Sequence, residues 1–256
     1  MNHEETLTFS QRLTRIEEQI DAACRRAGRS RNEVQLMAVS KTHPAEAVQE
    51  AIAAGITHFG ENRVQEFAQK SLALAQLGLA RTPGKPAPGS SVFHLIGHLQ
   101  SNKSTRAVEL FDAVDSLDSL RLAERLNEAA QARGRTLPVL LEIKLSPEEA
   151  KTGLDPQSRE LMELLERIPS LPALDLRGLM TVPPYSEDPE DARPYFRQLR
   201  ELREHLAQAH PALSFDQLSM GMSGDFAVAI EEGSTMVRIG TALFGHREYP
   251  DREYVR

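Results

Sequence analysis

Several residue types that mark particular classes of protein are scarce or missing in this sequence. Its 256 residues include no tryptophan, and its one cysteine, Cys24, excludes an intramolecular disulfide. A chain without disulfides is typical of a reducing compartment, so a cytoplasmic location is expected. No uncharged apolar run approaches the roughly 18 residues of a membrane-spanning helix, and no basic segment followed by an apolar one opens the chain. We therefore expect neither a membrane anchor nor a signal peptide.

An excess of positive charge is also missing. Acidic side chains number 37 and basic ones 30, which gives a formal charge of −7. Proteins that bind nucleic acids through phosphates carry a basic surface, so nucleic acid is not an expected partner. A chain of this length buries about three quarters of the surface that it exposes on unfolding. We expect one domain over residues 1–256.

What the sequence does contain is a regular alternation of two kinds of segment. Apolar residues from Phe9 to Ala23 recur at spacings of three and four, which predicts an amphipathic helix. Short apolar segments then predict eight strands, at 34–41, 57–62, 91–97, 113–116, 137–144, 176–182, 216–221 and 235–244. Helical segments follow the first seven strands, at 44–54, 63–77, from about 101, 119–133, 156–167, 189–209 and 225–232. This count predicts a single (β/α)8 TIM barrel with an extra N-terminal helix; a doubly wound open sheet is the alternative.

In such a barrel the chemistry lies where the strands end, and Lys41 closes the first strand. A lysine that ends an apolar strand is ordinarily a surface residue whose stem packs on the strand. At the mouth of a barrel, partial desolvation lowers the pKa of the amine. A neutral amine can then attack an aldehyde and form a Schiff base.

Small and hydroxylated residues gather after the last two strands. Ser219 and Ser223 close the seventh strand just before a helix, and Gly240 and Thr241 lie near the end of the eighth. These two loops form the recurrent phosphate site of TIM barrels, and a helix start attracts anions. The alternative is that the glycines serve only turns and packing. Together with a reactive lysine, this pattern predicts a phosphorylated aldehyde as the ligand.

Two other polar pairs flank strand ends. His94 and His98 are four residues apart, but a glycine interrupts the pair and no helical metal motif is present, so no metal site is expected. Asp115 and Asp118 bracket the end of the fourth strand. Two carboxylates this close could be acid/base partners, but capping of the following helix is the expected role.

Six segments together resemble the pyridoxal phosphate homeostasis proteins, the YggS/PROSC family. The resemblance covers about residues 9–246, with the six segments in the family's order. They are AVSKT at 38–42, FGEN at 59–62, HLIGHLQSNK at 94–103, RGLMT at 177–181, LSMGMS at 218–223 and VRIGTALFG at 237–245.

The resemblance implies a barrel like the alanine racemase N-terminal domain, holding pyridoxal 5′-phosphate (PLP). Lys41 would be the Schiff-base lysine, and Arg238 would face the pyridine nitrogen, leaving it unprotonated and the cofactor a weaker electron sink. Ser223, Gly240 and Thr241 would hold the phosphate, and Asn62 and His94 would line the pocket. The full set of implied cofactor-binding residues is Lys41, Asn62, His94, Ser219, Ser223, Arg238, Gly240 and Thr241. Glu142 and Lys144 stand where the family often has Gln-x-Asn, so no cofactor contact is carried over from the fifth strand.

The implied function is PLP homeostasis: the cofactor is buffered and delivered to the apo forms of PLP-dependent enzymes, by a monomer with no catalytic residues. A racemase or decarboxylase on the same barrel is the main alternative. Enzymes of that kind carry a second, β-rich domain, and only a short segment follows Gly245, so a binding protein is expected. An aldolase-like enzyme that uses Lys41 on its substrate is a third hypothesis.

Overall fold

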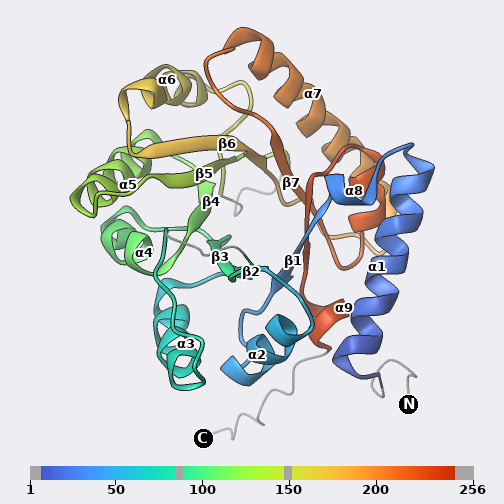
Figure 1. Cartoon of the computed structure of the whole chain (residues 1–256). Helices are drawn as coiled ribbons and strands as arrows, with labels where there is room; N and C mark the ends of the chain where they lie inside the picture. Colours follow the sequence, from blue (N-terminus) through green and yellow to red (C-terminus); the bar gives the residue numbers. More distant parts are fainter. Residues whose placement is uncertain (1–6, 85–88, 147–151, 246–256) are drawn as a thin grey trace, which may run out of the picture.

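Eight parallel strands close into a barrel in chain order, with β8 hydrogen-bonded to β1 (Figure 1). This is a computed structural model, and it describes residues 7–84, 89–146 and 152–245. Closure confirms the predicted TIM barrel, because an open sheet would leave β1 and β8 unpaired. The strands are β1 Gln35–Val39, β2 His58–Glu61, β3 Val92–Leu95, β4 Ala113–Leu117, β5 Leu137–Glu142, β6 Leu174–Met180, β7 Gln217–Met222 and β8 Met236–Ile239.

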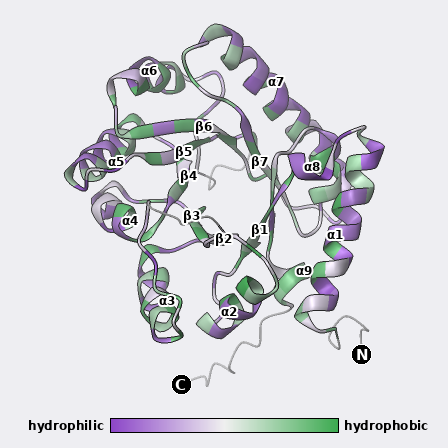
Figure 2. Cartoon of the chain, viewed as in Figure 1, coloured by the Kyte–Doolittle hydropathy of each residue, from purple (hydrophilic) through white to green (hydrophobic). Residues whose placement is uncertain are grey.

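Helices surround the strands, and they carry both hydrophilic and hydrophobic residues along their length (Figure 2). Their apolar sides pack on the outer face of the barrel, where Phe67 of α3 stacks on Phe93 of β3 at 4.7 Å between ring centroids. Short 3-10 helices, Ser101–Lys103 and Pro189–Ala192, precede α4 and α7. The helices are α1 Phe9–Arg26, α2 Ala45–Ala53, α3 Val64–Gln76, α4 Ser104–Leu110, α5 Leu120–Ala132, α6 Arg159–Arg167, α7 Arg193–Ala209, α8 Phe226–Glu231 and α9 Thr241–Phe244.

The predicted N-terminal helix is present as α1, which lies beside α8 and α9 (Figure 1). Thr8 begins it with a capping box, in which its hydroxyl accepts the N–H of Gln11 and the Gln11 side chain accepts the N–H of Thr8. Its buried stripe includes Ile20 and Cys24, so the thiol is a core residue, as the helical spacing predicts. No helix in the described parts of the chain is both long and apolar enough to cross a bilayer.

The eighth strand is shorter than predicted. We expected a strand over 235–244, but β8 ends at Ile239 and the next residues form the helical turn α9. Gly240 breaks the strand with φ −109° and ψ −86°, a backbone conformation far from that of a strand. Apolar content alone cannot distinguish a strand from a buried helical turn. The break turns the chain at the barrel mouth, two residues after Arg238.

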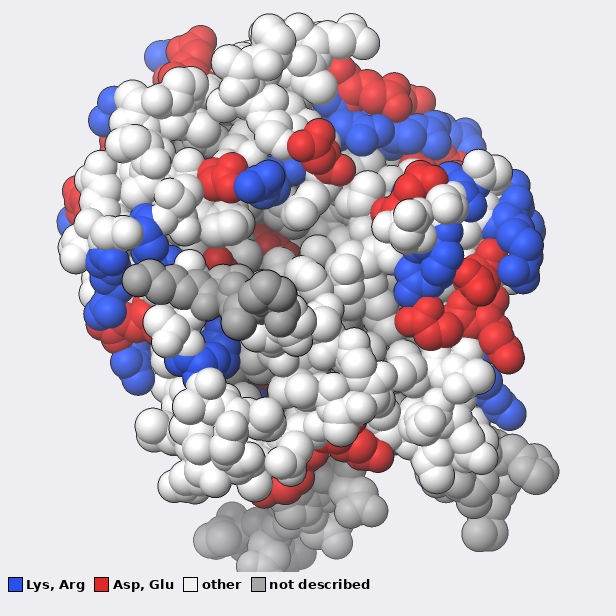
Figure 3. Space-filling view, viewed as in Figure 1, with Lys and Arg blue, Asp and Glu red and all other residues white. Residues whose placement is uncertain are grey.

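Acidic and basic side chains lie next to one another along α7 and over the neighbouring α8 and α1 (Figure 3). Arg193, Arg197 and Arg200 of α7 all reach the carboxylate of Glu232, which follows α8, with N–O distances of 3.2, 3.0 and 2.9 Å. The sequence pattern of α7 predicts only a solvated face of mixed charge. The tertiary structure turns part of that face into a clamp between two helices.

Candidate functional site

A cavity of about 330 Å³ opens where β1, β7 and β8 end. This volume lies within the usual range of small-molecule sites, about 300–1,000 Å³. Carboxyl ends of strands are where TIM barrels place their ligands. The residues lining the cavity are Val39, Lys41, Ile96, Pro184, Tyr185, Ser186, Asp188, Pro189, Ala192, Met222, Ser223, Gly224, Asp225, Arg238, Gly240 and Thr241.

Five of the eight predicted site residues line this one cavity: Lys41, Ser223, Arg238, Gly240 and Thr241. They lie at or just after the ends of three strands, β1, β7 and β8, and Lys41 and Thr241 are 200 residues apart in the sequence. Ser219 lies directly behind the cavity, fully buried, and holds Arg238. Asn62 and His94 are not among the lining residues.

Lys41 reaches the cavity because it follows β1 by two residues. Side chains alternate along a strand, so Val39 and Lys41 face the interior while Ser40 faces the surrounding helices. Ser40 is fully buried and Lys41 is partly exposed. The chain turns sharply after Lys41, where Thr42 has a φ of +66°. Among the described non-glycine residues, Thr42 is the one with a left-handed backbone.

Arg238 provides a fixed positive charge at the floor of the cavity. It is 3% exposed, and one terminal nitrogen donates to the carbonyl and the hydroxyl of Ser219 at 2.6 and 2.8 Å. The other terminal nitrogen donates to the carbonyl of Thr181 at 2.8 Å. Burial lowers the pKa of Arg238, and the nearby carboxylates Asp115 and Asp225 oppose that shift. A guanidinium held this way stays charged and is a poor proton donor to a ligand.

The loops after β7 and β8 are tied together on the other side of the cavity. The hydroxyl of Ser223 accepts the N–H of Ala242 at 3.3 Å, and the carboxylate of Asp225 accepts the N–H of Met222 at 2.6 Å. Gly221 lets the chain turn here: its φ is +93°, and a Cβ would lie 2.5 Å from the methyl of Ala229. This arrangement groups two hydroxyls and two glycines in one small concave surface, suited to an anion.

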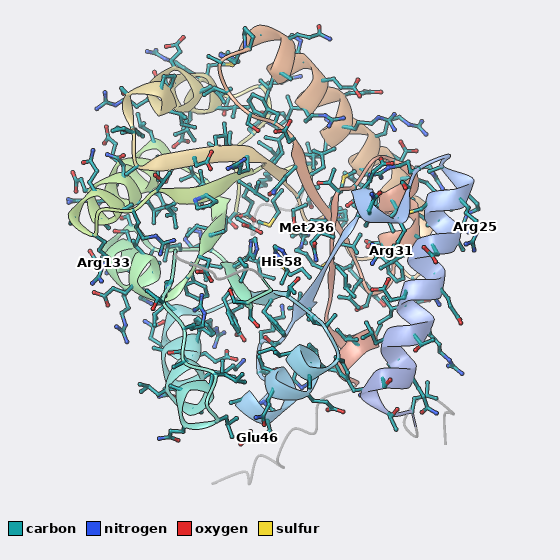
Figure 4. All side chains as sticks on the ribbon, in the orientation of Figure 1. Arg25, Arg31, Glu46, His58, Arg133 and Met236 are labelled. Atoms are coloured by element: carbon teal, nitrogen blue, oxygen red, sulfur yellow. The ribbon has the colours of Figure 1, made fainter. Side chains whose placement is uncertain are left out.

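His94 lies deeper in the barrel than predicted. It belongs to β3, and its Nδ1 lies 3.0 Å from Asp115 while its Nε2 lies 3.1 Å from Nδ1 of His58. Figure 4 shows His58 inside the ring of strands. Both histidines line a second cavity, of about 290 Å³, at the amino-terminal ends of the strands. His94 therefore lines this second cavity and not the one that contains Lys41.

The charges of these histidines are set by their surroundings. Burial and, to a lesser extent, the neighbouring His94 together lower the pKa of His58 to about 4. Burial acts in the same direction on His94, but the charge and hydrogen bond of Asp115 outweigh it and raise the pKa of His94. Of the two rings, His94 therefore binds a proton more readily than His58.

The expected capping role of Asp115 and Asp118 is wrong. Asp115 lies inside β4 and pairs with His94, whereas Asp118 accepts from His98 at 2.8 Å. The cap of α5 is Ser119, whose hydroxyl accepts the N–H of Leu122 at 3.4 Å. No group of three or more potential metal ligands is found in the described residues.

The sequence did not predict that the loop after β6 belongs to the site, whereas Glu142 was already singled out by its departure from the family pattern. The loop after β6 contributes Tyr185, which is 90% exposed at the rim of the cavity; the run PPYS at 183–186, after a strand end, was the available signal. Glu142 of β5 lies near Arg238, and burial raises its pKa. Its Oε1 accepts the hydroxyl of Thr152 at 3.2 Å, and its Oε2 is buried without a hydrogen-bond partner among the described residues.

Comparison with known proteins identifies the class first. The family described as alanine racemase, N-terminal domain, matches residues 12–248. The alanine racemase of Clostridium difficile 630 shares the fold with a TM-score of 0.61 at 16% identity, over 93% of this chain and 57% of that one. The fold and site thus define a (β/α)8 barrel of the alanine racemase N-terminal type.

Closer relatives identify the family. The pyridoxal phosphate homeostasis protein of Aquifex aeolicus (strain VF5) is 45% identical over 239 residues, covering 93% of this chain and 98% of the relative. That of Escherichia coli (strain K12) is 44% identical over 243 residues, covering 93% and 96%. PipY of Synechococcus elongatus PCC7942, whose structure was solved with PLP bound, is 40% identical with a TM-score of 0.78, covering 93% of this chain and 100% of that one. The chain belongs to the pyridoxal phosphate homeostasis protein family.

Proposed function

We propose that this protein binds PLP through Lys41 and serves intracellular PLP homeostasis, by storing the cofactor and delivering it to apo-enzymes. The observation that carries the proposal is that Lys41, Arg238 and the group Ser223, Gly240 and Thr241 line one cavity of about 330 Å³. An amine, a fixed cation and a concave group of hydroxyls match an aldehyde, a ring nitrogen and a phosphate, respectively.

The residues present fit the cofactor chemically. When bound, PLP supplies an aldehyde that condenses with a primary amine and releases water. A Cβ added to Gly224 would meet no atom within 4 Å, so this part of the lining, which also includes Ser223 and Thr241, leaves open space. Arg238 would hold the ring nitrogen as an acceptor, because it has no proton to give readily. Asn62 and His94, which line no part of this cavity, are left out of the proposed site.

We also propose that the protein works without significant amino-acid turnover, as a cytoplasmic monomer in which residues 1–256 act as one cofactor-binding unit. Racemisation through PLP needs an acid and a base on opposite faces of the cofactor. Arg238 beside the ring nitrogen disfavours the carbanion that such chemistry requires. The homeostasis name of the relatives supports this proposal, and the likeness of this chain to the solved alanine racemase is a likeness of fold alone.

The test is to locate the covalent bond. The protein is incubated with PLP, reduced with borohydride, digested and mapped by mass spectrometry. We expect a pyridoxyl group on Lys41, and we expect Lys41→Ala to lose both the label and the visible absorption band while remaining folded. Lys103→Ala is the matched control and should keep both. A label found only on another lysine would contradict the assignment.

A further inference from the structure

A buried group of charged side chains lies directly behind the turn that carries Lys41. The side chains of Glu61 on β2 and Lys70 on α3 are 0% and 6% exposed, and the ammonium lies 2.6 Å from Glu61 Oε1. The same ammonium donates to the backbone carbonyl of Ser40 at 2.8 Å. The hydroxyl of Ser40 donates to Glu61 Oε1, also at 2.8 Å.

A second contact from the same helix holds the other side of the turn. Glu66, in the first turn of α3, accepts the backbone N–H of Thr42 and lies 3.7 Å from the ammonium of Lys70. Thr42 is the residue with the left-handed backbone, which a β-branched side chain adopts only when its surroundings hold it there. The peptide groups on both sides of Lys41 are therefore bound to α3.

A buried ion pair is a poor source of stability, since an apolar pair of the same volume is often as stable. What charged side chains add here is specific positioning of the backbone. Lys70 binds the carbonyl of Ser40, and Glu66 binds the N–H of Thr42. Lys70 stands on the apolar stripe of α3, with Phe67 and Leu74 one turn to either side. A leucine or methionine there would serve packing alone.

We propose that Lys70 and Glu66, supported by Glu61, are positioning residues that hold the Ser40–Thr42 turn so that the Lys41 amine is presented to the cavity. The inference rests on the proposed role of Lys41. Lys70 and Glu66 bind the backbone around Lys41, and Glu61 binds the Ser40 hydroxyl and the Lys70 ammonium. None of the three is among the residues that line the cavity. Their loss should therefore impair covalent capture by Lys41 and leave the phosphate and ring contacts in place.

The test separates covalent from non-covalent binding with two probes. PLP can condense with Lys41, whereas pyridoxine 5′-phosphate has the same ring and phosphate but no aldehyde. For Lys70→Met we expect the apparent affinity for PLP, followed by the visible band, to fall at least tenfold. Affinity for pyridoxine 5′-phosphate, followed by calorimetry, should stay within about twofold. Lys70→Arg keeps a buried cation and should recover part of the PLP affinity, and Gln69→Ala, an exposed substitution on the same helix, should change neither.

Glu66→Gln provides the second variant, because it leaves the buried Lys70–Glu61 pair intact and weakens only the hold on Thr42. We expect the same selective loss and faster hydrogen exchange of the Thr42 amide in the unliganded protein. Equal losses for both probes in Glu66→Gln, or unchanged PLP affinity in both variants, would overturn the inference. Absence of label on Lys41 in the unsubstituted protein would instead overturn the proposed function itself, so the two failures are distinguishable.

Discussion

Ser223 and Thr241 show how single residues acquire a role from distant neighbours. They follow different strands, yet the Ser223 hydroxyl contacts the N–H of Ala242, next to Thr241. Their hydroxyls therefore belong to one surface, which the proposal assigns to the phosphate. A hydrogen bond to a charged group contributes about 1.5–3 kcal/mol, and each 1.4 kcal/mol changes an affinity tenfold.

For Ser223→Ala and Thr241→Val we expect PLP affinity to fall about tenfold or more, and pyridoxal affinity to change little, because pyridoxal has no phosphate to lose. Equilibrium titration with both ligands measures the difference. Ser71→Ala, a hydroxyl loss on α3 outside the cavity, is the control and should affect neither ligand. Equal affinity of the unsubstituted protein for PLP and pyridoxal would show that the phosphate site lies elsewhere.

The lowered pKa of His58 predicts how the stability of the protein depends on pH. Its pKa is about 4 in the folded protein, against about 6.5 for an ordinary histidine. Between these values the unfolded chain binds a proton that the folded chain does not, so His58 makes the free energy of unfolding decrease as the pH falls from 6.5 to 4. His94 acts with the opposite sign, because its raised pKa stabilises the fold at low pH and this contribution is lost as the pH rises through that pKa.

In His58→Gln the acid-side loss of stability should therefore be smaller, by an amount of the order of 1–3 kcal/mol across the window. Urea unfolding at several pH values between about 4 and 7 measures it. Replacing the exposed His205 of α7 with glutamine provides the matched control. Parallel pH profiles for the unsubstituted protein and His58→Gln would contradict the assignment.

At the scale of elements, the clamp between α7 and the end of α8 depends on one carboxylate. The Glu232 side chain is 6% exposed and accepts from three arginines of α7. Burial opposes its ionisation, but the arginine hydrogen bonds outweigh this and lower the pKa of Glu232. The clamp fixes α8, which follows the β7 loop that bears Ser223 and so helps to shape the cavity mouth.

Removing the carboxylate in Glu232→Gln should lower the free energy of unfolding by about 1–3 kcal/mol, because three cations lose a shared acceptor. Chemical denaturation measures the change. Glu204→Gln on the exposed part of α7, whose contacts to Arg200 and Arg203 are long, 3.9 and 3.7 Å, is the control and should cost less than about 0.5 kcal/mol. A difference between the two variants smaller than the error of measurement would argue against the clamp.

At the scale of the whole molecule, the cavity sits at the open mouth of the barrel, with Tyr185 exposed on its rim. If the proposed function is correct, PLP bound in this open cavity can dissociate and be taken up by an apo-enzyme. We expect PLP to pass from the loaded protein to an apo-enzyme, measured as regained activity of that enzyme. We expect only trace racemase and decarboxylase rates over the common amino acids. A turnover number within the ordinary range of about 1–1,000 per second would favour the racemase or decarboxylase alternative.

The sequence by itself determined the barrel, its N-terminal helix and most of the candidate site. The periodicities of strands and helices depend on residues close in sequence, so they can be read without a structure. Ligands of such barrels bind where the parallel strands end, and this rule predicts that Lys41, Ser223 and Thr241 lie in the same site. The same periods predict that Cys24 is buried. Errors at element ends, such as the overlong eighth strand, arise because apolar residues suit both a strand and a buried turn.

Only the tertiary structure decided which side chains meet inside and behind the barrel. The depth of His94, and its pairing with Asp115, depend on where each strand ends relative to its neighbours. The contact of Lys70 with the carbonyl before Lys41 depends on how α3 packs against β1 and β2. Such partners lie about 20 to 30 residues apart, and no local period relates them. Closure of the barrel brings these partners into contact, because it fixes the position of each strand along the barrel axis relative to its neighbours.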